Sequence, residues 1–259
     1  MKMRMKITYP DGTVHNGKKD FLNWTDYLGI TNYDFTGKRV LDIATDEGWW
    51  AFWVEMNGAD YVEASDVENG EDYDWGAEKD WDWINKLNEN RGGRKVFDFH
   101  HKNLNSKVVV KKESIYDVKG EFDWVFAHGL TYHLRHPLLA IENVKKVCNG
   151  VFIFETFVDI NNPNQYIAES KFYRTTELSA VSNWTGATTA CYVSWLKDAG
   201  FEDIYYTIPK QPPLGESRQI FVAVCDPSYN TKLFKNNKNL IYCDKEYFNK
   251  VWENTKFKK

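Results

Sequence analysis

Cysteine is scarce in this chain, with four in 259 residues. They lie far apart, without the paired spacing of a zinc site or the density of a disulfide framework: Cys148, Cys191, Cys225 and Cys243. A reduced, cytoplasmic protein is therefore expected. The first residues alternate basic and apolar side chains with no apolar segment after them, which argues against a secretory signal. No apolar run reaches the roughly 18 residues of a membrane span, so no membrane partner is expected.

The chain also lacks an excess of positive charge. Its net charge is −4 and its pI about 5.9, so the overall charge does not favour a nucleic-acid partner. Residues 231–259 are an exception, with eight lysines against three acids. Such a tail could bind a phosphate backbone, but we favour a helix whose aromatic side chains pack on the domain: Phe234, Tyr242, Tyr247, Phe248 and Trp252. Aromatic residues make up 16% of the chain, which indicates either a ring-lined pocket or surplus core packing.

Glycine is sparse where a dinucleotide-binding turn would need it. Residues 42–48 read Asp-Ile-Ala-Thr-Asp-Glu-Gly, with one glycine and three acids. A pyrophosphate binder uses three glycines, whose backbone amides surround the phosphates. Acids repel phosphate but suit an ammonium and a sulfonium, so the turn favours S-adenosylmethionine over NAD. An ordinary α/β turn with solvated acids is the alternative interpretation.

The residues around this turn predict a nucleoside site. Asp42 ends a buried strand, and Gly48 permits close approach of the backbone to a ligand. Asp66 ends the next strand, about 20 residues after the turn, where an acid binds ribose hydroxyls. Ser114 and Ile115 follow a third strand, where a short polar side chain and an apolar one can hold adenine.

Alternating strand and helix patterns predict an α/β fold, a doubly wound Rossmann-like sheet of about seven strands with an antiparallel last strand. We expect strands at 39–43, 60–65, 108–112, 122–127, 151–154, 201–208 and 219–225. Helices are expected at 21–28, 49–57 and 137–147 and in a segment that ends at 199–200. Residues 68–83 are expected to form a loop followed by a helix. A turn at 9–13 predicts a short N-terminal hairpin.

Three histidines gather at the expected end of the fourth strand: His128, His133 and His136. They straddle a strand end and a helix start without a cysteine or acid cluster, which disfavours a metal site. His133 is the best candidate to line the pocket of the methyl acceptor; capping of the following helix is the alternative.

The chain resembles class I S-adenosylmethionine-dependent methyltransferases over residues 5–225. Within them it is similar to the branch of the tRNA wobble-uridine (carboxy)methyltransferase-like proteins. The matching segments include Gly37-Lys-Arg-Val-Leu-Asp-Ile, Asp46-Glu-Gly-Trp-Trp-Ala-Phe, Asp72-Tyr-Asp-Trp75, Tyr132-His-Leu-Arg-His-Pro-Leu-Leu-Ala and Leu196-Lys-Asp-Ala-Gly-Phe201. One position departs from the family pattern, because Ala44 stands where the first glycine of the turn is usual.

The resemblance implies a role for each matching position. The amino-acid end of the cofactor S-adenosyl-L-methionine would lie at Asp42, Ala44 and Gly48, its ribose at Asp66, its adenine at Ser114 and Ile115, and its methionine side near His128. Tyr132 and His133 would face the transfer region. If the acceptor must lose a proton, His133 or Glu155 would take it. No metal is implied.

The same resemblance divides the chain into an N-terminal cap (1–35), a methyltransferase domain (36–226) with a lid insertion at about 160–187, and the basic-aromatic tail (227–259). A small hydroxyl- or amine-bearing acceptor, a metabolite or sugar-like molecule, is the favoured substrate. A tRNA-type nucleic-acid acceptor and an inactive binding module stay as alternatives. Methyl transfer is favoured over carboxymethyl transfer, because no motif assigns Arg135, Arg174 or Arg218 to a carboxylated cofactor. No pattern indicates the oligomeric state.

Overall fold

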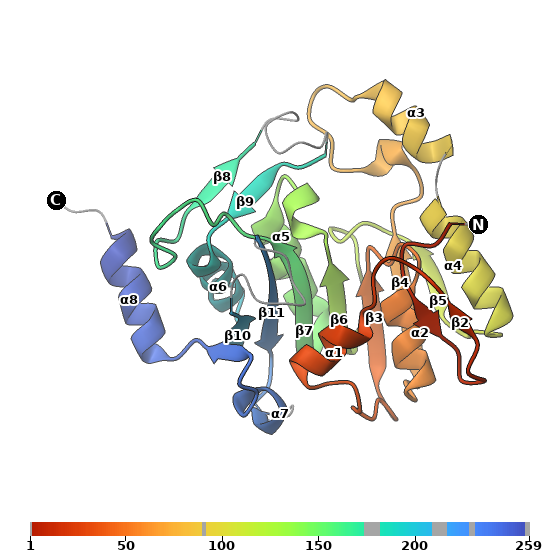
Figure 1. Ribbon diagram of the computed structural model, residues 1–259. Helices are drawn as coiled ribbons and strands as arrows, with labels where there is room; N and C mark the ends of the chain where they lie inside the picture. The colour runs from red at the N-terminus through yellow and green to blue at the C-terminus, as the bar shows by residue number, and fades with distance from the viewer. Residues whose placement is uncertain (1, 90–91, 174–181, 209–216, 228–230, 257–259) are drawn as a thin grey trace.

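The computed structural model describes residues 2–89, 92–173, 182–208, 217–227 and 231–256. A central eight-stranded sheet organises them, in the order β12-β10-β11-β7-β6-β3-β4-β5 (Figure 1). Its strands are β3 (Arg39–Ile43), β4 (Tyr61–Asp66), β5 (Val109–Lys112), β6 (Phe122–His128), β7 (Cys148–Phe157), β10 (Asp203–Thr207), β11 (Arg218–Val224) and β12 (Leu240–Tyr242). The predicted α/β class is confirmed.

Strand directions change within this sheet. Strands β5, β4, β3, β6 and β7 run parallel, whereas β11 lies antiparallel between β7 and β10. The predicted sheet of about seven strands, with an antiparallel last strand, is confirmed, and β12 from the basic tail adds an eighth by pairing antiparallel with β10. Three residues among lysines and asparagines carry too little apolar alternation to indicate a strand.

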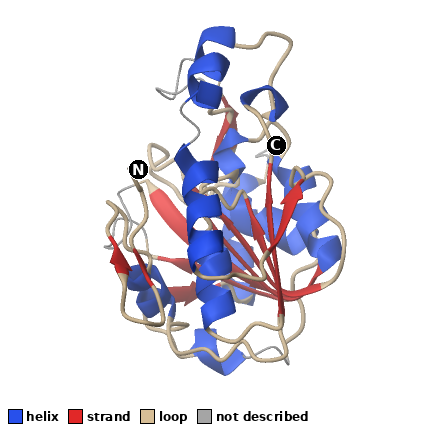
Figure 2. Cartoon of the chain, turned by 90° about the vertical axis from the view of Figure 1, so that its right-hand side faces the viewer, coloured by secondary structure: helices blue, strands red, loops and turns tan. Residues whose placement is uncertain are grey.

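The helices cover the two faces of the sheet, as the edge-on view in Figure 2 shows. Helices α5 (Pro137–Val147), α6 (Thr189–Asp198) and α8 (Lys245–Thr255) pack on one face, in the same apolar cluster as Leu41 and Ile43. The opposite face carries α1 (Leu22–Leu28), α2 (Trp49–Met56), α4 (Gly92–Asn103) and α7 (Thr231–Lys235), which pack against Val40. This alternation along β3 follows from the two-residue period of a strand. None of the described helices combines the length and apolar character needed to cross a bilayer.

Smaller elements gather at the end of the sheet toward which β6 points (Figure 1). They are a 3₁₀ turn η1 (Gly70–Asp72), helix α3 (Trp81–Glu89), and the hairpin of β8 (Ser170–Phe172) with β9 (Thr185–Ala187). A satellite cluster of Trp75, Ile84 and Trp184 joins the two groups. The expected lid insertion corresponds to this hairpin, and its residues 174–181 lie outside the described residues.

The tail packs on the domain, as predicted. Phe234 is fully buried and Tyr247 is 6% exposed, in the cores of opposite faces of the sheet. Trp252 is an exception, with 67% of its surface exposed. The tail is therefore part of the folded domain.

The predicted N-terminal hairpin is confirmed as β1 (Ile7–Thr8) and β2 (Val14–His15). We call residues 2–20 the N-terminal strap, because this segment doubles back and runs beside the turn that follows β3. Lys6 N donates to Lys19 O at 2.7 Å, and Lys19 N donates to Arg4 O at 2.8 Å. Gly17 is required, since a Cβ there would lie 2.3 Å from the backbone of Met5.

Candidate functional site

The turn after β3 is built around a buried carboxylate. Asp42 is 2% exposed, and its Oδ2 accepts hydrogen bonds from Thr45 Oγ1 at 2.7 Å and from the N–H of Ala51 at 3.2 Å. Burial raises the pKa of Asp42 to about 7, against the lowering effect of these bonds. Asp42 therefore ties the turn to α2.

Ala44 and Asp46 have left-handed backbone conformations, with φ of 55° and 51°. This conformation brings Cβ close to the following carbonyl and costs an L-residue about 1–2 kcal/mol. The turn thus keeps the geometry of a glycine-containing turn although Ala44 replaces the usual glycine.

Replacing Ala44 by glycine should raise the free energy of unfolding by about 1 kcal/mol, because the strain at φ 55° exceeds the entropy that glycine adds to the unfolded chain. Urea denaturation measures the change. Ala51→Gly, in the helical part of α2, is the control and should destabilise by a similar amount. An Ala44→Gly variant less stable than the parent would contradict the strain argument.

Gly48 serves packing. Its φ is +83°, and a Cβ there would lie 2.5 Å from the rings of Phe52 and Phe97. It is not among the described residues that line the cavity below. The missing side chain therefore lets α4 pack against α2, and the expected approach of a ligand to Gly48 stays a prediction.

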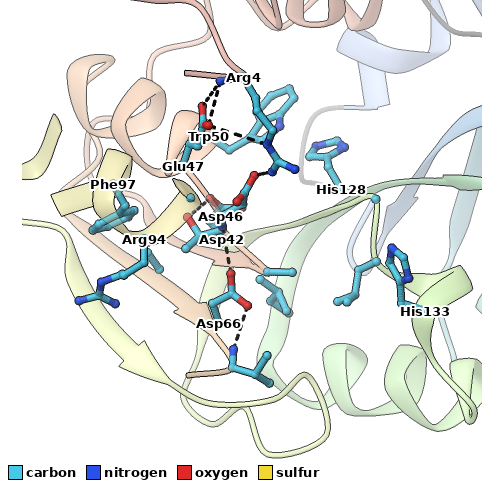
Figure 3. A pocket seen from close by; sticks show the side chains of 18 of the residues that line it. Arg4, Asp42, Asp46, Glu47, Trp50, Asp66, Arg94, Phe97, His128 and His133 are labelled. Atoms are coloured by element: carbon cyan, nitrogen blue, oxygen red, sulfur yellow. Dashed lines mark hydrogen bonds and ion pairs between the residues drawn. The ribbon is translucent and has the colours of Figure 1, made fainter. Parts of the chain in front are cut away.

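The acid at the end of β4 faces the same turn. Asp66 is partly buried; its Oδ2 accepts from the N–H of Asp46 at 3.1 Å and its Oδ1 from the N–H of Val67 at 2.8 Å (Figure 3). Ser114 and Ile115 follow β5, next to β4 in the sheet, and Ile115 is 3% exposed. The three side chains come together because parallel strands end at one edge.

A cavity of about 1180 Å³ opens at this edge. Nine of the ten predicted site residues line it: Asp42, Ala44, Asp66, Ser114, Ile115, His128, Tyr132, His133 and Glu155. A site for one drug-sized ligand has roughly 300–1,000 Å³. The cavity is therefore large enough for two ligands side by side.

His128 ends β6 inside a cluster of rings. It stacks on Trp50 with ring centroids 4.3 Å apart, and Trp24 meets it edge-on at 5.8 Å. Both of its ring nitrogens and Trp50 Nε1 are enclosed without a hydrogen-bond partner among the described residues. Burial, with a smaller contribution from Arg218, lowers the pKa of His128 to about 3, so this imidazole is neutral at physiological pH.

His133 lies one short turn further, in η2 (Thr131–His133). Its Nδ1 lies 2.9 Å from Ser182 O, which can only accept, so we assign the proton to Nδ1 and the lone pair to Nε2. Burial lowers the pKa of His133 to about 4, the bond to Ser182 opposing this and the Arg218 charge adding to it. The His133 ring is therefore a neutral imidazole and a weak base, and it lines the cavity.

Glu155 is not a free base. It is 2% exposed and forms a two-point ion pair with Arg218, through Nε–Oε1 and through Nη2–Oε2 at 2.8 Å. The same guanidinium lies 4.6 Å from the centroid of the Tyr132 ring. We therefore replace the expected proton transfer by Glu155 with a positioning role. Arg218 enters the site because β11 is antiparallel and begins where the parallel strands end.

The acids of the turn are also engaged by the protein. Arg4 of the N-terminal strap forms an ion pair with Asp46 (Figure 3). Glu47, 2% exposed, accepts the N–H groups of Arg4 at 2.9 and 3.0 Å and of Met5 at 2.8 Å. The sequence argument assigned these acids to an ammonium and a sulfonium; in the structure they hold the strap over the turn instead.

Other residues of the expected site lie elsewhere. Arg135 is not among the described residues of this cavity; its Nη1 donates to Trp75 O at 3.2 Å and its guanidinium lies over Trp184. Arg174 lies outside the described residues. No group of three or more described His, Cys, Asp and Glu side chains is placed to hold a metal ion.

No protein-family model matches this chain, and no curated protein sequence matches it significantly. Solved structures share its fold. Magnesium protoporphyrin IX methyltransferase from Synechocystis PCC 6803, with bound S-adenosylmethionine, is 13% identical over 78% of this chain and 76% of its own, with a TM-score of 0.52. An S-adenosylmethionine-dependent methyltransferase from Mesorhizobium loti is 13% identical over 77% and 96%, with a TM-score of 0.50.

The N-terminal domain of EvdMO1, crystallised in the presence of S-adenosylhomocysteine and D-fucose, is 15% identical over 85% of this chain and 88% of its own, with a TM-score of 0.54. At these identities the likeness concerns the fold, which is that of known methyltransferases. These similarities support the methyltransferase fold and do not support the tRNA wobble-uridine branch specifically.

Proposed function

We propose that this protein is an S-adenosylmethionine-dependent methyltransferase acting on a small hydroxyl- or amine-bearing molecule. The observation that carries the proposal is that nine of the site residues predicted from the sequence line one cavity at the ends of β3, β4, β5 and β6. The methyltransferase fold of the solved neighbours supports it.

The residues present fit the cofactor. Asp66 offers a partly buried carboxylate to the ribose, and Ile115 offers an apolar surface to the adenine. The left-handed turn at Ala44 offers its backbone to the amino-acid end of the cofactor. The unpaired ring nitrogens of His128 and Trp50 mark a ligand-binding wall on the other side. When bound, S-adenosylmethionine supplies a methyl group activated by its sulfonium.

The chain contributes positioning, exclusion of water and a proton acceptor. Methyl transfer is an in-line displacement, which depends on alignment of the two reactants. Residues of the strap line one side of the cavity, and His133 Nε2 can accept the proton that a hydroxyl or amine acceptor releases. Arg218 and Tyr132, fixed by Glu155, hold the acceptor side.

Replacing Asp66 by alanine should weaken binding of S-adenosylmethionine and its demethylated product by about 1.5–3 kcal/mol, through loss of a charge-assisted hydrogen bond to ribose. Calorimetry measures both affinities, with NAD and ATP expected to be silent. Glu68→Ala is the control, since Glu68 also lines the cavity but forms an exposed ion pair with Lys112; about twofold or less is expected there. Unchanged affinity in Asp66→Ala would remove this residue from the site.

Transfer of labelled methyl to fractionated small molecules, compared with bulk tRNA and DNA, tests the acceptor. Label in a small-molecule fraction supports the proposal. Label in tRNA alone would contradict it and favour the nucleic-acid alternative. Cofactor binding without any transfer would favour the inactive binding module.

A further inference from the structure

Arg218 presents a fixed cationic edge to the cavity. Its Nε and Nη2 are held by the buried Glu155, and its plane rests on Tyr132. No described residue accepts a hydrogen bond from Nη1, and 28% of the side chain is exposed. A Cβ at Gly129 would lie 3.6 Å from Arg218 Nη2 and 3.7 Å from Tyr132 Oη, so the missing side chain leaves room beside this edge.

Lys19 brings a second cation to the same cavity. Its backbone is held in the strap by hydrogen bonds with Lys6 and Arg4. Among the described residues, no carboxylate lies within 4.0 Å of its Nζ. Partial burial of the Lys19 ammonium lowers its pKa. The charge of Glu155 raises this pKa, and the charge of Arg218 lowers it further. Lys19 is therefore within electrostatic reach of the Glu155–Arg218 pair.

The carboxylates of this corner are already neutralised. Asp46 pairs with Arg4, Glu47 accepts backbone N–H groups of the strap, and Glu155 pairs with Arg218. The strap adds Lys2 and Lys18 to the lining. The whole lining holds eight Lys or Arg residues and nine Asp or Glu residues, so positive charge dominates only at this corner. Here the strap lysines stand beside carboxylates that are already engaged, which favours a negatively charged ligand.

The wall beside these cations consists of rings. Trp24 and Trp50 come from α1 and α2, and both contact His128 at the end of β6. Aromatic walls favour flat, apolar ligand bodies through stacking and edge contacts. The Trp50 N–H and the His128 nitrogens are enclosed in this wall without a hydrogen-bond partner among the described residues.

We propose that the methyl acceptor is a small molecule with a flat ring and one anionic group, a carboxylate or a phosphate, which binds between Lys19 and Arg218. This proposal rests on the proposed function and names the class of its acceptor. A small molecule is favoured over a polynucleotide because Arg218, whose side chain is 28% exposed, and the rings beside it line a cavity.

The test uses three probes of similar ring size: benzoate, phenyl phosphate and the neutral benzyl alcohol. Each is titrated into the full chain, with and without saturating S-adenosylhomocysteine, and followed by tryptophan emission. We expect benzoate or phenyl phosphate to bind at least about tenfold more tightly than benzyl alcohol, since a charge-assisted hydrogen bond contributes that much. The tighter of the two anions identifies the group.

Lys19→Met should weaken binding of the anionic probe about 5–10-fold and leave the affinity for S-adenosylhomocysteine unchanged. Lys6→Met is the matched control: it removes the same charge from the same strap, but Lys6 Nζ lies 2.9 Å from Asp20 Oδ2 and is not among the described cavity residues. Only Lys19→Met should lower the affinity for the anion.

Two results would overturn the inference: equal affinities for benzyl alcohol and the anions, or equal effects of Lys19→Met and Lys6→Met. If the protein still binds S-adenosylmethionine, the proposed function stands in either case. Absence of cofactor binding would overturn the proposed function, and the titrations without cofactor would still decide the anion preference. The inference would also be overturned if an oligonucleotide bound more tightly than either anion. A preference for a carboxylated cofactor, if Lys19→Met abolishes it, would overturn the inference as well.

Discussion

Replacing Arg218 by methionine is expected to lower the free energy of unfolding by about 3–5 kcal/mol. The substitution leaves Glu155, 2% exposed, without its ion-pair partner. A buried carboxylate that loses its cation keeps the full cost of its removal from water, whereas the intact pair offsets that cost with two well-aligned bonds. The contact of the guanidinium with the Tyr132 ring is lost as well.

Chemical denaturation monitored by far-UV circular dichroism measures this effect. The double variant Arg218→Met, Glu155→Leu should recover to within about 1–2 kcal/mol of the parent, because no charge is then left buried. Lys112→Met, which breaks the exposed pair with Glu68, should cost about 1 kcal/mol or less. A single Arg218→Met variant as stable as Lys112→Met would show that the Glu155 carboxylate is not sealed from water.

Replacing Phe234 by alanine is expected to lower the free energy of unfolding by about 3–5 kcal/mol. Phe234 is fully buried, and its ring centroid lies 6.2 Å from that of Trp124 and 6.1 Å from that of Tyr205. Removing the ring opens a cavity under β10 and β6, in the core of the sheet. The basic tail thus stabilises the domain.

Trp252→Ala is the matched control, since Trp252 belongs to the same tail but is 67% exposed. Its removal should change stability by about 0.5 kcal/mol or less. Similar melting temperatures for the two variants would contradict the packed position of the tail. A deletion of residues 231–259 would remove β12, α8 and part of both cores, so loss of activity in such a variant would report on folding.

Several elements could be predicted from the sequence because local signals were strong. The bounds of β3 and α5 agree with the expected ones, since an apolar run follows Gly37 in one case and Pro137 starts the other. Helix α4 was missed: its Gly92-Gly93 start has poor helix propensity. Its buried residues Val96, Phe97 and His100 nevertheless carry a helical spacing that could have indicated it.

The candidate site was predictable to the extent that it depends on strand order. Asp66, Ser114 and His128 come together because parallel strands end at one edge of a sheet. The placement of the strap beside the turn and of Arg218 in the site was not predicted, because both depend on distant contacts: Gly17 against Met5, and the insertion of β11 between β7 and β10. The acids of the turn were assigned to a ligand because nothing local shows that Arg4 and Met5 bind Asp46 and Glu47.

The place of β11 between β7 and β10 also affects how the chain is made. During synthesis β7 can pair with β6 on one side, but its other edge stays unpaired until β11 has been translated. At roughly 5–20 residues per second, the intervening chain of about 60 residues takes on the order of 3–12 s to appear. Throughout this interval Val151, Phe152, Ile153 and Phe154 form an open apolar edge that can pair with another nascent chain. We expect early release by premature termination before β11 to yield insoluble protein, with holdase chaperones bound to this edge.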